Sequence, residues 1–161
     1  MNNKLRTLTS LIITLSLVGC SNESKMEAVC KDISKRISTD PSTFRVNEVR
    51  TTSAKMTSAD VLSFLQTKYP NGIPDATNKL REMLASEKDE KSSQTFVTVD
   101  FSAQSDKGAK RNEVLCHYVN WTGTTTSLNS ITANNRDYTD LLGVFLRFGK
   151  PDGLNLQNNI E

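Results

Sequence analysis

The stretch that decides the fold is TFVTVDFSAQSDKGAKRNEVLCHYVNW, residues 95–121. Its first part alternates apolar and polar side chains, which is the pattern of a strand with one buried face. The apolar positions are Val97, Val99, Phe101 and Ala103. The polar segment 104–112 contains Gly108 and predicts a turn. Residues 114–121 are apolar at odd and even positions, which indicates a central strand that pairs with the first as a hairpin.

A helical pattern precedes this hairpin. Residues 25–38 carry apolar side chains at three- and four-residue steps. Ser24 and Glu27 have the spacing of a capping box, in which each side chain satisfies a free amide at the helix start. Asp40-Pro41 ends the pattern, because a residue before proline avoids the helical conformation. We therefore predict a first helix over 25–38 with Cys30 on its buried face.

Three further helices are predicted, at about 57–69, from about 74 into the charge run 87–91, and at 137–148. The first of these follows the capping residues 57–60 and stops at Pro70-Asn71-Gly72. For the last, Asp137 and Asp140 are the expected N-terminal caps, and Gly149 is the expected stop.

Two more segments complete the predicted sheet. Residues 43–51 predict a strand, whereas the threonine-rich residues 122–131 suit either another strand or a long loop. The chain shows no internal repeat and no linker. We therefore predict one small α+β domain over 25–152, with helices packed on an antiparallel sheet, followed by a frayed tail at 153–161.

The first twenty residues have the three parts of a secretory signal. Lys4 and Arg6 give a basic start, residues 8–18 form an apolar run, and Gly19 directly precedes Cys20. A helix that spans a bilayer needs about 20 apolar residues, so this run is too short to remain as one. We predict that residues 1–19 are a signal peptide that is removed.

Leu17-Val18-Gly19-Cys20 resembles the lipobox of bacterial lipoproteins. The resemblance implies cleavage before Cys20, lipidation of its sulfur, acylation of the freed amine by a chain such as palmitate, and membrane attachment. Residues 20–24 would then form a short lipidated tether. Ser21 stands where the inner-membrane retention signal has aspartate. In a cell with two membranes, this implies the outer membrane, at its periplasmic face or at the cell surface.

The charge of the chain excludes one class of partner. Two of the 20 basic residues and none of the 18 acidic residues precede Cys20, so the rest of the chain is balanced in charge. Proteins that bind nucleic acid normally carry a basic excess or a basic stripe. We therefore expect no nucleic-acid partner.

Two cysteines remain after Cys20. In an oxidising envelope compartment, Cys30 and Cys116 predict a disulfide bond. A metal site that also uses His117 is a competing interpretation, but these three side chains fall short of the four ligands of a structural zinc site. A pair of free thiols is the third alternative.

A wider set of short motifs is similar to a pattern in small disulfide-bonded envelope proteins of bacteria and phages, whose function is uncertain. The matching pieces are Cys30-Lys31, Asp40-Pro41-Ser42-Thr43-Phe44, Val99-Asp100-Phe101-Ser102-Ala103-Gln104, Gly108-Ala109 and Cys116-His117-Tyr118. In that pattern a helix cysteine precedes a turn and a strand, and a hairpin leads into a strand cysteine. The resemblance implies a Cys30–Cys116 bridge and carries no activity.

His117 is the only histidine and therefore the first candidate for catalysis. A catalytic pair with Cys116 is conceivable. Neighbours along a strand point to opposite faces, however, which sets these two side chains back to back. The sequence contains no nucleophile elbow, phosphate loop or zinc-protease motif. We therefore predict a structural histidine, with no catalytic residue, metal or cofactor.

These features together favour a non-catalytic binding or interaction module that its lipid holds in the bacterial envelope. Its expected partners are the membrane, through the covalent lipid, and another envelope protein. An envelope hydrolase whose site the sequence does not reveal is the alternative.

Overall fold

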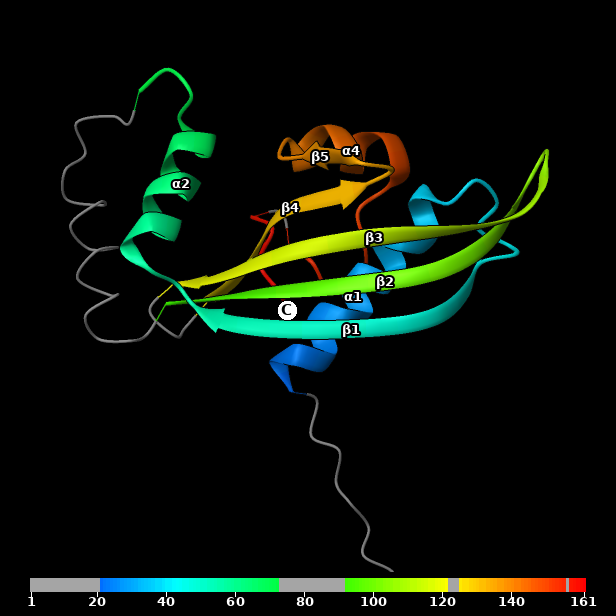
Figure 1. The fold of residues 1–161 in the computed structure, drawn as a ribbon, viewed down its shortest axis with the longest axis horizontal. Coiled ribbons are helices and arrows are strands. Elements are labelled where there is room, and N and C mark those ends of the chain that lie inside the picture. Colours follow the sequence, from blue (N-terminus) through cyan, green and yellow to red (C-terminus); the bar gives the residue numbers. More distant parts are fainter. Residues whose placement is uncertain (1–20, 73–91, 122–124, 156) are drawn as a thin grey trace, which may run out of the picture.

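The structure, a computed structural model, describes residues 21–72, 92–121, 125–155 and 157–161 (Figure 1). In these ranges it has helices on an antiparallel sheet with strand order β1-β2-β3-β4-β5. The elements are α1 (Asn22–Ile37), β1 (Arg45–Lys55), α2 (Ser58–Lys68), β2 (Ser93–Ser105), β3 (Gly108–Trp121), β4 (Thr125–Ala133), β5 (Arg136–Tyr138) and α4 (Leu141–Phe148). The predicted fold class, one α+β domain with an antiparallel sheet, is confirmed.

The predicted hairpin forms the centre of the sheet. β2 pairs with β3 in one unbroken register from Ser93↔Asn120 to Ser105↔Gly108. The predicted turn at 104–112 is too long, because only residues 106 and 107 connect the strands. Gly108 has a φ of 101°, which a glycine adopts at little cost, and strand pairing resumes there. The polar residues beyond it continue the ladder, because backbone hydrogen bonds do not require apolar side chains.

One face of the sheet forms the main core under α1. Met26, Val29, Cys30 and Ile33 of α1 are buried there against the predicted apolar face of β2 and against β3 and β4. The helix begins earlier than predicted, since Ser21 is the N-cap and its Oγ accepts a hydrogen bond from the Ser24 amide at 3.3 Å. The predicted cap Ser24 is therefore wrong, and this residue lies inside the first turn.

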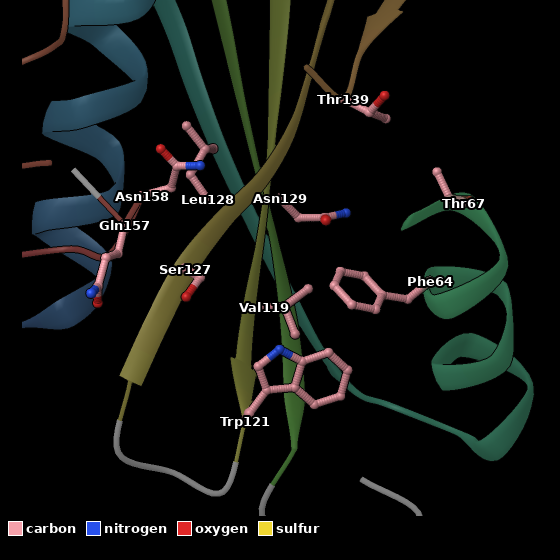
Figure 2. A pocket seen from close by; sticks show the side chains of 10 residues that line it. All are labelled: Phe64, Thr67, Val119, Trp121, Ser127, Leu128, Asn129, Thr139, Gln157 and Asn158. Atoms are coloured by element: carbon pink, nitrogen blue, oxygen red, sulfur yellow. The ribbon is translucent and has the colours of Figure 1, made fainter. Parts of the chain in front are cut away.

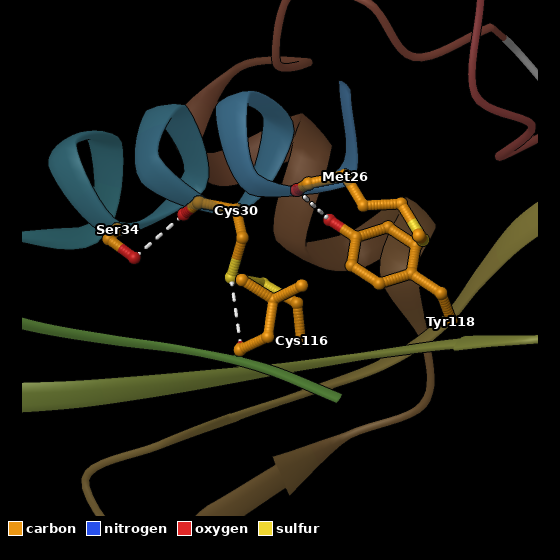
Figure 3. The surroundings of a disulfide bond; sticks show 6 residues. Met26, Cys30, Ser34, Cys116 and Tyr118 are labelled. Atoms are coloured by element: carbon orange, nitrogen blue, oxygen red, sulfur yellow. Dashed lines mark hydrogen bonds between the residues drawn. A yellow bond between two sulfur atoms is a disulfide. The ribbon is translucent and has the colours of Figure 1, made fainter. Parts of the chain in front are cut away.

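A disulfide bond joins α1 to β3 (Figure 3). Cys30 and Cys116 have Cα atoms 5.9 Å apart, and both side chains are fully buried. Beside them, the buried hydroxyl of Tyr118 donates a hydrogen bond to the Met26 carbonyl oxygen at 2.8 Å. Burial raises the pKa of this hydroxyl well above its ordinary value. The predicted disulfide is confirmed, in place of a metal site or free thiols.

The opposite face of the hairpin carries a buried acid. Asp100 accepts hydrogen bonds from the Arg111 guanidinium, which contacts both of its carboxylate oxygens, and from Asn47 Nδ2 at 2.9 Å. These bonds lower the pKa of Asp100 to about 2. Asp100 thus points away from the core face that Val99 and Phe101 form, and its charge is satisfied locally.

The last helix is shorter than predicted. α4 begins at Leu141, where the Asp140 carboxylate accepts a hydrogen bond from the Gly143 amide at 3.2 Å, and it ends at Gly149, whose φ is 86°. Asp137 is not a cap, so that prediction is wrong. It lies in β5 and accepts a hydrogen bond from Thr132 Oγ1 at 2.6 Å, because the short β5 pairs with the end of β4.

The tail at 153–161 is not frayed, and this prediction is wrong. Leu154 is fully buried in the main core. The Leu128 amide donates to the Asn158 carbonyl at 2.8 Å, and the Ile160 amide donates to the Thr126 carbonyl at 2.9 Å. The segment therefore packs along β4, and the described residues of the tail belong to the domain.

Several predictions concern other parts of the chain. The signal peptide 1–19, Cys20, and the helix from about 74 with its charge run 87–91 lie outside the described residues. Within the described ranges, no helix has the length and apolar composition needed to cross a bilayer.

Candidate functional site: a groove between α2 and the sheet

The helix α2 packs on the face of the sheet opposite α1. Its start lies at the predicted capping residues 57–60, which form a capping box. Thr57 Oγ1 accepts from the Asp60 amide at 3.2 Å, and Asp60 Oδ2 accepts from the Thr57 amide at 2.9 Å. These bonds lower the pKa of the Asp60 carboxyl. Val61 and Leu65 bury their side chains against Met56 at the end of β1. They form a second, smaller core that includes Val119 of β3.

A cavity of about 400 Å³ lies between α2, β3, β4 and the C-terminal segment (Figure 2). It is lined by Phe64, Thr67, Val119, Trp121, Ser127, Leu128, Asn129, Thr139, Gln157 and Asn158. A second hollow of about 240 Å³ shares four of these side chains, Phe64, Thr67, Asn129 and Thr139, and adds His117 and Asp60. We call the two hollows together the α2 groove.

The register of β4 explains why an amide points into the groove. The pairing of β3 with β4 shifts between His117 and Tyr118, which face Ser130 and Leu128, so that Asn129 is an extra residue in the ladder. Figure 2 shows the Asn129 side chain directed toward α2. Such a bulge re-aims a single side chain, and here it supplies the groove with a hydrogen-bonding group.

His117 lies on the groove side of β3, back to back with Cys116 as predicted. Its ring stacks on Phe96 with centroids 4.5 Å apart, and its Nδ1 is 3.1 Å from Asn129 Nδ2. An amide nitrogen donates, so Nδ1 accepts and the proton of the neutral ring is on Nε2. Burial lowers the pKa of His117, which the negative charge of Asp60 partly opposes. Nε2 is buried and has no hydrogen-bond partner among the described residues.

The remaining polar side chains around His117 are hydroxyls, amides and carboxylates. Ser63, Gln94, Ser130 and Asp137 line the same hollow as the imidazole. Within the described residues, no three His, Cys, Asp or Glu side chains are placed to hold a metal ion together. The two hollows together offer hydroxyl, amide and carboxylate groups beside the aromatic rings of Phe64 and Trp121, whose centroids are 5.0 Å apart.

Comparison of the chain with protein-family models, with curated proteins and with solved structures found no match in any of the three sets. What the α2 groove can bind is therefore argued from its own geometry. Sequence reasoning singled out His117 but missed Asn129, Phe64 and Trp121. The bulge and the placement of α2 bring these side chains together, and neither produces a periodic pattern in the sequence.

A substitution of His117 should change stability in a pH-dependent way. Loss of the ring stack and the Asn129 contact should lower the free energy of unfolding of His117→Gln by about 1–2 kcal/mol at pH 8. Because burial holds the folded pKa below the unfolded value near 6.5, the unfolded wild-type chain binds more protons below that pH. The wild type should then lose stability as the pH falls below 6.5. The difference in free energy of unfolding between the wild type and His117→Gln should therefore be smaller at pH 5 than at pH 8.

Urea unfolding of both proteins at pH 8 and pH 5 measures this effect. Lys107→Gln, in the exposed hairpin turn, is the control and should match the wild type at both values. If His117→Gln shows the same pH slope as the wild type, His117 is not the buried neutral group described above.

Proposed function

We propose that this chain is a bacterial lipoprotein, lipidated at Cys20, whose domain binds another envelope protein without catalysis. The start of α1 is the observation that carries this proposal. Ser21 is the N-cap and Asn22 is already helical, so only Ser21 separates Cys20 from a rigid element. The tether is thus shorter than the predicted 20–24, and a lipid on Cys20 would hold the domain at the bilayer.

The anchoring of α1 to the sheet supports the same proposal. The Cys30–Cys116 bond and the Tyr118–Met26 hydrogen bond fix the N-terminal half of α1 to β3. A lipid at Cys20 would therefore position the whole domain, rather than one loosely attached helix. This suits a module that meets its partner at the membrane.

The composition of the α2 groove supports binding. Phe64, Val119 and Leu128 supply apolar surface, whereas Asn129 and Thr139 supply hydrogen-bonding groups. Apolar walls with a few placed polar groups are the usual make-up of binding sites. The His117 ring, hydrogen-bonded to Asn129, adds a flat side chain to the wall of the adjoining hollow.

A hydrolase remains the second candidate, because one observation favours it. Ser130 lies opposite His117 in the β3–β4 register, and both line the same hollow as Asp137. A serine, a histidine and a carboxylate are the groups of a nucleophilic site. No hydrogen bond between these three side chains is present in the structure's described part, so a hydrolase would require them to move.

Site-specific crosslinking tests the binding proposal. A photoreactive side chain in place of the exposed Thr67, which lines both hollows, should form an adduct with an envelope protein in living cells. The same group in place of Lys107, on the hairpin turn, is the control. Asn129→Arg, which fills the groove, should remove the adduct at equal protein abundance. An adduct that forms equally well from position 107 or survives Asn129→Arg would contradict binding in the groove.

Replacement of Cys20 tests the anchor. Cys20→Ala should abolish palmitate incorporation and cleavage of the signal, because no other cysteine follows a complete signal sequence. Two or more acyl chains are needed for firm attachment, so the variant should lose its lipid-dependent attachment to membranes. Lys107→Gln, on the exposed hairpin turn, is the control and should keep its label. Undiminished labelling of Cys20→Ala would show that another residue carries the lipid.

A further inference from the structure

The helices α1 and α4 form one layer on the same face of the sheet (Figures 1 and 3). Leu141 and Val144 of α4 are buried in the same core cluster as Val29 and Ile33 of α1. The two helices also meet at their C-terminal ends, where Gly149 packs close to the Arg36 guanidinium. The helix α2 and its core lie on the other face of the sheet, and the α2 groove extends from there to Leu128 and the C-terminal segment at β4. The layer therefore has an outer surface that points away from α2.

The outer surface of α1 carries two lysines. Its residues opposite the buried positions, at 100° per residue, are Ser24, Ala28, Lys31 and Lys35. Glu27 and Asp32 flank this stripe on its two sides. Glu27 beside it forms an ion pair with Lys31 at 3.6 Å, and the flanking Asp32 is bonded to Arg36 at 2.9 Å.

The outer surface of α4 is apolar. Leu142 and Leu146, one turn apart, expose 68% and 79% of their surface and are the two most exposed of the large hydrophobic residues described. Arg147 lies over the Phe148 ring at 5.0 Å, and Lys150 follows the helix as a second exposed cation. The acidic groups nearby are Asp140, which caps the helix, and the exposed Asp152.

We propose that this outer surface lies against the bilayer that holds the Cys20 lipid, with Leu142 and Leu146 in the interfacial zone and Lys31 and Lys35 facing anionic phospholipid headgroups. Exposed leucines beside lysine and arginine are the composition of segments that lie in a membrane interface. Basic residues near an anionic lipid surface are attracted to it electrostatically. This orientation rests on the proposed lipid anchor.

The orientation has a consequence for the other side of the molecule. Because α1 and α4 cover one face of the sheet and α2 covers part of the other, a layer held against the bilayer turns the α2 groove toward the aqueous compartment. A partner could then reach the groove without displacing lipid. A second copy on the α4 leucines would instead leave the groove without a fixed direction.

Depth-sensitive fluorescence on the lipidated protein in vesicles tests the orientation. An environment-sensitive dye is attached to Leu146→Cys, or to Leu62→Cys, an exposed leucine of α2 on the opposite face, as the matched control. The vesicles contain phosphatidylethanolamine and phosphatidylglycerol, with a spin-labelled acyl chain as quencher. The dye at position 146 should be quenched, and the dye at position 62 should not.

The outcomes separate this proposal from the anchor on which it rests. Protein that does not float with vesicles overturns both. Protein that floats but is unquenched at position 146, or is quenched equally at position 62, overturns the orientation alone. The emission of the dye at position 146 could also shift to the blue only at high protein density, without quenching by the lipid quencher. That result would indicate contact with a second copy and would overturn the proposed orientation.

The lysines provide an independent arm. Lys31→Gln/Lys35→Gln should reduce quenching at position 146 in vesicles that contain phosphatidylglycerol, and should have no effect when neutral phosphatidylcholine replaces it. Both side chains lie on the outer surface of α1, so the substitution should leave the fold intact. If the protein with both lysines and the double variant are quenched equally in both kinds of vesicle, the proposed contact of the lysines with anionic headgroups is wrong.

Discussion

Loss of the Cys30–Cys116 bond is expected to lower the free energy of unfolding by about 4–5 kcal/mol. The bond closes a loop with a sequence separation of 86 residues, and in the chain-entropy model the cost of releasing such a loop is of this size. Domains of this size are stable by about 5–15 kcal/mol, so most of the stability is at stake. The oxidised protein should therefore unfold at a much higher urea concentration than the reduced protein.

The choice of substitution determines whether the measured loss of stability reflects the disulfide bond alone. Both sulfurs lie in a fully buried apolar cluster, so serine would add two buried hydroxyls and exaggerate the loss. Cys30→Ala/Cys116→Ala avoids this and should resemble the reduced wild type, with a further loss from the small cavity. Reductant should not change the midpoint of the double variant. A loss below about 1 kcal/mol would mean that the unfolded chain gains little freedom on reduction.

The central elements follow from local pattern. β2 and β3 are recognisable because a strict alternation meets a run that is apolar on both faces, and only a central strand buries both faces. The capping box at Thr57 is equally local, since Asp60 lies three residues away. Each of these signals is contained within a few residues and needs no knowledge of the rest of the chain.

The peripheral elements depend on tertiary contacts. β5 has three residues, too few for an alternation, and it exists because it pairs with the end of β4. Among the described residues of the tail, Leu154 is a fully buried apolar side chain, and backbone bonds hold the tail to β4. Polar composition alone predicted fraying there, because backbone pairing to a distant strand leaves no mark on side-chain type.

Some features of the candidate site follow from local sequence, and others depend on tertiary contacts. The back-to-back placement of Cys116 and His117 follows from strand geometry, and the structure agrees. The α2 groove does not follow, because it requires the docking of α2 across β3 and the bulge that turns Asn129 toward His117. A one-residue insertion in a strand pairing is invisible until the partner strand is known.

The proximity of the domain to the bilayer should control how well it captures its partner. With Ser21 as the helix cap, an anchor at Cys20 leaves the domain almost no freedom to leave the membrane surface. A partner in the same membrane would then meet the groove at a high effective concentration, an effect that can raise apparent affinity by about 10²–10⁴-fold. The yield of the position-67 crosslink measures this directly.

Three forms at matched abundance separate attachment from proximity: the anchored protein, a soluble exported form that starts at Ser21, and an anchored form with about 20 Gly/Ser residues inserted between Cys20 and Ser21. The insertion must precede Ser21, because placing it after that residue would remove the helix cap and confuse stability with reach. Such a linker spans on average about 25 Å, enough to free the domain from the surface while keeping it attached.

The soluble form should lose at least about tenfold in crosslink yield, and the linker form should fall between it and the anchored protein. An intermediate value indicates that closeness to the membrane matters in addition to attachment. If the linker form equals the anchored protein and only the soluble form fails, attachment alone is sufficient. Equal yields from all three forms would show that the partner is captured away from the membrane, and the short tether would then have no part in binding.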